Sequence, residues 1–276
     1  MDTKIVIIYV IVSDYLQSIH HVEDPQSRMS DAEVITTAIV SALFFSGRYE
    51  TACSLMQGRQ YMPSMLSKSR FNRRLHRVKP LLLNLFALLS ELFKEENHEA
   101  IYLIDTFPIS VCDNWRIGRC RLYKGEAYRG YIASKRRYYY GLKLHLMVTQ
   151  SGRPVELFLT PAAESDVACL ELFDFDLPPG SEVYADRIYN NYLLEDILRE
   201  AGIEFLPIRK KNSKRKLPPW LDYWQKKSRK MIETTGSLLE RRLPKSIHAV
   251  TAVGFELKVV LFVLAESFSQ LFKVAT

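Results

Sequence analysis

The chain has 276 residues, of which 47% are apolar and 25% are charged, and its net charge at pH 7 is +7. The length suits one large domain or two smaller ones, and the composition is ordinary for a globular protein. No apolar run approaches the roughly 20 residues of a membrane-spanning helix. The apolar run at residues 5–12 lacks the flanks of a signal peptide. We therefore expect a cytoplasmic protein that makes no membrane contact.

The four cysteines carry no metal-binding pattern. None of them stands in a Cys-x-x-Cys pair, and Cys112 and Cys120 are eight residues apart without matching histidines. A zinc site or a disulfide framework is therefore not expected, and buried thiols are the simpler interpretation.

Positive charge is concentrated in one segment. Between Arg209 and Lys245, thirteen lysines and arginines stand against three acids. Such a local excess suits a polyanionic partner, which favours nucleic acid. The alternative is a solvated loop with spare cations.

The first part of the chain has the periodicity of helices. A helix is expected within residues 1–25. Ser30 and Glu33 have the spacing of a capping box, which predicts a helix that continues to Phe45 and ends at Gly47. Two further helices are expected at residues 50–57 and 81–94.

A basic helix is expected near residues 66–78. Phe71, Leu75 and Val78 share one face of it. Several short helices followed by a basic one resemble a helix-turn-helix unit, so we predict a helical DNA-binding domain at residues 1–98. An ordinary basic surface helix is the alternative. The arginines on the other side of this helix, which are the candidate DNA contacts, are Arg70, Arg73, Arg74 and Arg77.

From residue 99 the pattern changes to strands. We expect an α+β or α/β catalytic domain over residues 99–276, with a mixed five-stranded sheet flanked by helices. An antiparallel meander followed by a βαβ-like half is the layout of an RNase H-like domain, in which the first and fourth strands lie side by side. The expected strands are 101–105, 138–149, 154–160, 183–186 and 203–208; the expected helices are 166–173, 191–201, one that carries Glu233, and 253–272.

Three carboxylates stand at informative places in this domain. Asp105 and Asp186 each end an apolar strand, and Glu233 lies in the basic segment, with spacings of 81 and 47 residues. A buried carboxylate costs free energy unless something pairs with it, and a metal ion is the usual partner where several acids converge. We therefore predict a metal site, although a single strand-end aspartate can equally be a turn or cap residue.

Other side chains are weaker candidates. Lys143 and His145 alternate onto one face of the second strand and could approach the acids or lie on the sheet surface. Asp166 could support the site or cap a helix. Trp220 and Trp224 could stack on an unpaired base, although core packing is the commoner role.

Several short blocks, in the right order, resemble DDE transposases of bacterial insertion sequences. The similarity is strongest to the insertion-sequence 982 family, near the insertion-sequence 4 group, and it extends over essentially the whole chain. The blocks are Ile104–Pro108, Arg129–Lys135, Tyr140–His145, Ala185–Tyr189 and Ile232–Thr234.

The resemblance implies a function and a set of site residues. Asp105, Asp186 and Glu233 match the catalytic triad, which would hold Mg²⁺, with Mn²⁺ as a possible substitute. The implied activity is cleavage of transposon ends and joining of the 3′-OH to target DNA by two-metal-ion phosphoryl transfer. The implied partners are double-stranded DNA and a second copy of the chain, and the implied location is the bacterial cytoplasm at the nucleoid.

The chain departs from the broader group's pattern at Lys226 and Glu240, where tyrosine and lysine are usual, but it keeps Arg229. The alternatives are an RNase H-like nuclease that cuts without joining, and a decayed DNA-binding protein without catalysis. The remaining predicted DNA contacts are Lys210, Lys211, Lys214, Arg215, Lys226, Arg229 and Lys230.

Overall fold

The computed structural model describes residues 1–209, 212–215, 218, 221, 223, 243 and 247–274. It divides into two compact units. The helical unit comprises Met1–Leu89 with the described part of Leu239–Thr276, and the sheet unit comprises the described part of Ser90–Leu238. Among the described residues, no helix combines the length and the hydrophobicity needed to cross a bilayer.

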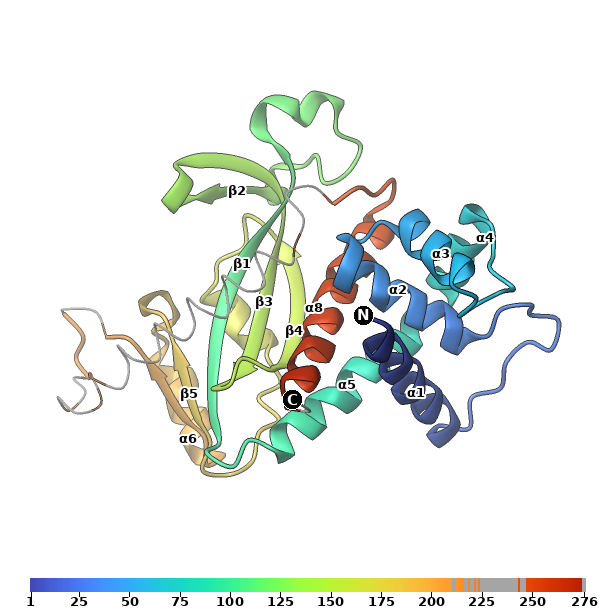
Figure 1. Ribbon diagram of the computed structural model, residues 1–276. Coiled ribbons are helices and arrows are strands. Elements are labelled where there is room, and N and C mark those ends of the chain that lie inside the picture. Colours follow the sequence, from blue (N-terminus) through green and yellow to red (C-terminus); the bar gives the residue numbers. More distant parts are fainter. Residues whose placement is uncertain are drawn as a thin grey trace. The chain divides into compact units, whose positions relative to one another are not determined.

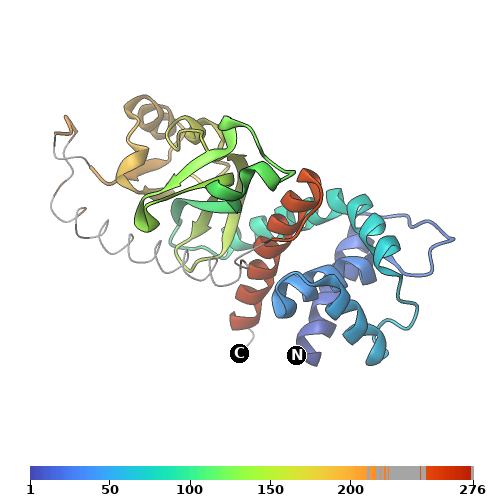
Figure 2. The ribbon, with the colours of Figure 1, turned by 90° about the horizontal axis from the view of Figure 1, so that it is seen from above.

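The helical unit is built around one buried helix. Helix α2 buries 11 of its 15 residues and contacts α1, α3, α4 and α8. A helix that is apolar on nearly all sides suits a central position in a helical core. Figure 2 shows α8 lying beside α2. The described helices of this unit are α1 (Asp2–Ser18), α2 (Asp31–Phe45), α3 (Tyr49–Gly58), α4 (Lys68–Arg77), the first part of α5 (Lys79–Glu95) and α8 (Ala252–Val274).

The predicted boundaries of α2 are confirmed. Ser30 Oγ accepts a hydrogen bond from the Glu33 backbone N–H at 3.1 Å, and the Glu33 carboxylate accepts one from the Ser30 N–H at 2.7 Å. The helix ends where Ser46 and Gly47 adopt φ values of 51° and 75°, a conformation that stops a helix and favours glycine.

The last helix differs from expectation in its neighbours. We expected residues 253–272 to belong to the sheet domain, but α8 packs on α2 in the helical unit. Its buried side chains include Phe255, Val259 and Phe262, each at most 1% exposed. The two ends of the chain therefore share one apolar core.

Among the described residues the sheet has six strands rather than the five expected. Figure 1 shows β1, β3 and β4 side by side. Strand β3 pairs antiparallel with β1, β2 and β4, whereas β1, β5 and β6 run parallel. The extra strand is β2. Gly130 is its one fully buried residue, so β2 lacks the run or alternation of apolar residues that predicts a strand. The strands are β1 (Ile101–Asp113), β2 (Arg129–Ile132), β3 (Arg137–Thr149), β4 (Pro154–Pro161), β5 (Glu182–Ala185) and β6 (Glu204–Pro207).

Two further expectations are corrected. Strand β1 continues to Asp113 instead of ending at Asp105, because its ladder with β3 persists through a bulge between Ser110 and Cys112. The helix expected at 166–173 is only a 3₁₀ turn, Ala168–Leu172, and the Asp166 side chain pairs with Lys143 instead of capping it.

The mixed sheet places β1 beside β5, as predicted. The parallel pairs run from Ile101↔Glu182 to Ile104↔Ala185. Helix α6 (Tyr192–Glu200) connects β5 to β6 and contacts β6. Ser90 of α5 donates a hydrogen bond to the Val155 carbonyl of β4 at 2.5 Å, so the last turns of α5 belong to the sheet unit.

Candidate active site

Two of the three predicted acids occupy neighbouring positions on the adjacent strands β1 and β5. The last parallel pair of β1 and β5 is Ile104↔Ala185, and Asp105 and Asp186 are the next residue of each strand. Both follow fully buried strand residues and are themselves half-buried. In adjacent parallel strands, the residues that follow a paired position lie next to each other. Ligand sites in sheets of this kind form at the carboxyl ends of the strands.

The Tyr189 hydroxyl lies within the electrostatic influence of three acids. Burial raises the pKa of this phenol well above its usual value, and the negative charges of Asp105, Asp166 and Asp186 raise it further. Three carboxylates therefore act on one buried, neutral hydroxyl. Asp166 therefore acts on the same hydroxyl as the two predicted acids.

A chain of hydrogen bonds supports β1 beside Asp105. The Thr106 N–H donates to Asp105 Oδ1 at 2.8 Å. The Thr106 hydroxyl is hydrogen-bonded to Tyr189 OH at 2.5 Å and to His145 Nδ1 at 3.0 Å, and His145 Nε2 is hydrogen-bonded to the Thr160 hydroxyl at 2.9 Å. Four segments of the sheet unit are thereby tied together beside the acid.

His145 is a structural member of this chain. Its side chain is fully buried and stacks on Phe158, with ring centroids 4.6 Å apart. Burial lowers the pKa of His145 to about 4, more than the opposing charge of Asp166 raises it. The imidazole is therefore neutral at pH 7, and it supports Thr106 rather than supplying a charge.

Lys143, the other weak candidate on β3, is engaged by Asp166. Its ammonium group lies 2.9 Å from Asp166 Oδ1 and donates to the Glu164 carbonyl at 2.6 Å. The Lys143 ammonium group therefore neutralises the charge of Asp166, one of the three acids that act on Tyr189.

The third acid and most of the basic segment lie outside the described residues. The structure therefore tests neither the position of Glu233 nor the predicted DNA contacts around it. The predicted site residues in this group are Glu233, Lys210, Lys211, Trp220, Trp224, Lys226, Arg229 and Lys230.

The predicted DNA-contacting cations that are described fall into two sets. Arg70, Arg73, Arg77 and Lys214 are exposed. Arg215 is held by Asp196, with both guanidinium–carboxylate contacts at 2.8 Å.

Arg74 is also engaged inside the protein. It is hydrogen-bonded to Asp31 at 2.6 Å and to Ser27 at 2.5 Å. This arginine joins α4 to the start of α2, so it is not placed as a DNA contact.

One acid–histidine cluster in the helical unit has the spacing of a metal site. The ligand atoms of His21, Glu23 and Asp31 all lie within 4.8 Å of one another. Asp31 already pairs with His21 at 2.9 Å and with Arg74, and its N–H donates to Glu23 at 2.9 Å. Internal bonds therefore account for this cluster, which fastens the loop before α2.

Sequence reasoning missed the roles of Thr106 and Tyr189. The available signal was the position of these residues, one and three residues after the two acids. The contact of Thr106 with His145 follows from the Thr106↔His145 pairing of β1 and β3. The pairing depends on the strand register, which a single sequence does not specify.

The two acids that follow the last parallel pair of β1 and β5 define a candidate acidic active site. A family model described as "Transposase DDE domain" matches residues 95–247, which include Asp105, Asp186 and Glu233. The chain belongs to this family of DDE transposases.

One solved structure supports the fold. The chain is similar to a chain in the cryo-EM structure titled "piggyBac transposase synaptic complex with hairpin DNA", with a TM-score of 0.50 and 11% identity; the match covers 97% of this chain and 73% of that chain. At this identity the likeness concerns the fold alone. No curated protein sequence matches the chain significantly.

Proposed function

We propose that this protein is the transposase of a bacterial insertion sequence of the insertion-sequence 982 family. It cleaves the ends of its element and joins the freed 3′-OH to target DNA. The observation that carries the proposal is that Asp105 and Asp186 are the next residues beyond the parallel pair Ile104↔Ala185 of β1 and β5. The family match supports this reaction class.

The order of the strands supports an RNase H-like catalytic domain. An antiparallel half, β4–β3–β1, continues into a parallel half, β1–β5–β6. This is the layout expected from the sequence, and it sets the first acid beside the second.

The two acids beyond the last parallel pair of β1 and β5 fit a divalent metal ion. Asp105 and Asp186 offer hard carboxylate oxygens, the donors that Mg²⁺ prefers, and Mg²⁺ uses few protein ligands when substrate phosphates complete its shell. Asp105, Asp186 and Glu233 would hold the ions, and Mn²⁺ could substitute. When bound, two such ions activate the attacking oxygen and stabilise the leaving oxygen.

The surrounding groups orient Asp105. The Thr106 N–H fixes one oxygen of Asp105, and Tyr189 and His145 hold Thr106 in turn. Arg229, four residues before Glu233, is proposed to hold a DNA phosphate. Joining two element ends to one target requires at least two active sites, so we propose a homodimer on double-stranded DNA.

The test is strand cleavage and joining with Mg²⁺ on DNA that carries the sequences flanking the gene. Asp105→Asn and Asp186→Asn should each lose both activities by at least about 100-fold, since even indirect partners of a metal contribute 10- to 100-fold. Asp176→Asn is the matched control, because Asp176 is 85% exposed and its ion pair is with Lys94, at 3.5 Å.

Three results would contradict the proposal in different ways. Cleavage without joining would favour an RNase H-like nuclease. Binding of DNA without either activity would favour a decayed DNA-binding protein. Activity that survives Asp186→Asn would exclude the predicted metal site.

A further inference from the structure

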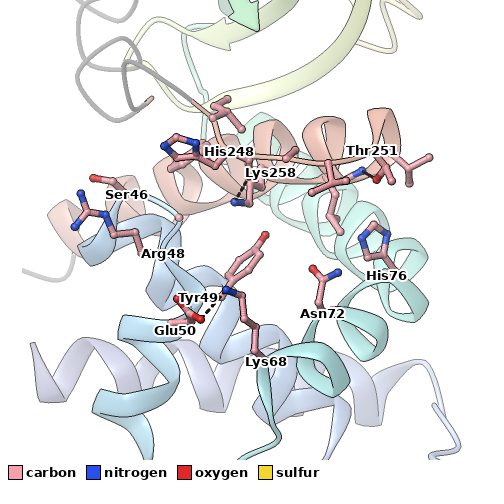
Figure 3. Close-up of a pocket in the computed structure, with 18 of the residues that line it drawn as sticks. Ser46, Arg48, Tyr49, Glu50, Lys68, Asn72, His76, His248, Thr251 and Lys258 are labelled. Atoms are coloured by element: carbon pink, nitrogen blue, oxygen red, sulfur yellow. Dashed lines mark hydrogen bonds and ion pairs between the residues drawn. The ribbon is translucent and has the colours of Figure 1, made fainter. Parts of the chain in front are cut away.

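A cavity of about 940 Å³ lies within the helical unit, and the transposase reaction does not account for it. It lies at the upper end of the size range of ligand sites. Its walls come from three places: the segment that opens α3, one face of α4, and the segment that leads into α8 (Figure 3).

The rim of this cavity is cationic. Arg48 and Lys68 are exposed at its edge, and Lys258 reaches it from α8. Among the described residues that line the cavity, Glu50 is the only acid, and it pairs with Lys68 at 2.6 Å. The described lining therefore carries a net positive charge before either of its histidines is protonated.

The Lys258 ammonium group is held inward. It donates to the His248 carbonyl at 2.7 Å and lies 4.9 Å from the centre of the Tyr49 ring. Figure 3 shows Tyr49 and Lys258 directed toward one another across the cavity. Burial lowers the pKa of Lys258, which means that its positive charge is incompletely solvated and that a nearby anion would stabilise it.

The cavity also has an apolar floor and further polar groups. Leu257 and Phe262 form part of the floor, each 1% exposed. Asn72 and His76 project from α4 into the space (Figure 3). On α4 these two residues and Lys68 share one helical face, which is distinct from the face of Arg70, Arg73 and Arg77.

Three helices begin at this cavity, which adds to its positive potential. Helices α3, α4 and α8 start at Tyr49, Lys68 and Ala252, and residues at or beside all three starts line the space. The residues that precede α3 and α4, Arg48 and Ser67, make no side-chain cap hydrogen bond. Helix N-termini favour anions.

We propose that this cavity binds one nucleotide of the transposon DNA, with its flanking phosphates on the cationic rim and its sugar and base over the apolar floor. The proposal rests on the proposed function and adds a DNA-anchoring site to it. A positive rim combined with an apolar floor matches the two parts of a nucleotide, whereas a purely apolar ligand would match the floor alone.

The test measures binding of full-length protein to fluorescent end DNA over a range of salt concentrations. The variant Arg48→Gln/Lys68→Gln should bind about tenfold more weakly at low salt. The slope of log affinity against log salt should become shallower by roughly 1.8, the value for two lost phosphate contacts. Asn72→Met, which changes no charge but narrows the cavity, should also weaken binding.

The control variant is Arg28→Gln/Arg59→Gln. It removes the same charge from the same unit, and neither residue lines the cavity. Far-UV circular dichroism of every variant verifies the fold. Equal weakening by the control would assign the effect to overall charge and would overturn the proposal, as would unchanged binding by Arg48→Gln/Lys68→Gln.

A second arm separates DNA from a free ligand. Thymidine 5′-monophosphate is added, and the thermal unfolding midpoint is measured. Stabilisation of the wild type but not of Arg48→Gln/Lys68→Gln, with unchanged DNA binding in both, would make a free nucleotide the ligand and overturn the proposal.

The same samples separate this proposal from the proposed function. If the wild type cleaves DNA and cavity variants bind normally, the cavity proposal fails alone. If the wild type binds no DNA, both proposals fail.

Discussion

Replacing Thr106 by valine tests the hydrogen-bond chain beside Asp105 most directly. Valine keeps the branched shape of threonine but removes the hydroxyl that is bonded to His145 Nδ1 at 3.0 Å and to Tyr189 OH at 2.5 Å. His145 is fully buried and Tyr189 is 1% exposed, so water cannot readily replace the lost partner at either group.

The expected cost follows from these two groups. Each buried polar group left without a partner costs about 1–3 kcal/mol. Thr106 itself is only half-buried, which allows partial relief, so Thr106→Val should lower the free energy of unfolding by about 2–4 kcal/mol. DNA cleavage should also fall, because the Thr106 N–H that orients Asp105 is no longer held by these neighbours.

The assay is urea unfolding followed by circular dichroism, with Thr36→Val as the matched control. The Thr36 hydroxyl is buried and has no hydrogen-bond partner among the described residues, so its removal should be neutral or stabilising. Equal stability of the two variants within about 0.5 kcal/mol would refute the reasoning.

Two further predictions concern the sheet unit. Because burial lowers the pKa of His145 to about 4, the unfolded chain binds a proton between pH 6.5 and 4 that the folded chain does not; stability should therefore fall with decreasing pH in this window. The difference between the unfolding free energies of the wild type and His145→Gln should change by about 3 kcal/mol across this window. A difference that does not change with pH would contradict the assigned burial of His145. Gly141→Ala should cost at least about 2 kcal/mol of unfolding free energy, because its Cβ would lie 2.1 Å from the Ile109 carbonyl oxygen. Gly58→Ala, with no atom within 4 Å of the new Cβ, should instead stabilise by roughly 0.4–1 kcal/mol, and similar effects at both glycines would argue against the close strand approach.

Local chemistry made several features predictable from the sequence. The capping box at Ser30 depends on residues three apart, and the β3–β4 hairpin depends on the turn at residues 150–153. Both are confirmed because neighbours in the chain determine them. The side-by-side placement of β1 and β5 was also predictable, since a mixed sheet with this order of elements has few arrangements.

The errors arose where distant residues decide the structure. Strand β1 extends beyond its apolar run because β3 supplies hydrogen-bond partners as far as Asp113. Asp166 resembles a helix cap in the sequence, but Lys143, 23 residues away, binds its carboxylate. The engagement of Arg74 by Asp31 likewise depends on the packing of α4 against α2. Helical periodicity alone does not distinguish Arg74 from the exposed arginines of α4.

The packing of α8 on α2 makes the sheet unit an insertion within the helical one. During synthesis, the strands that carry Asp105 and Asp186 are complete before the last helix has been made. Until then α2 lacks one of its packing partners, and apolar surface that α8 would cover remains open to solvent. The sheet unit can therefore reach its native topology first, whereas the helical unit must wait for α8.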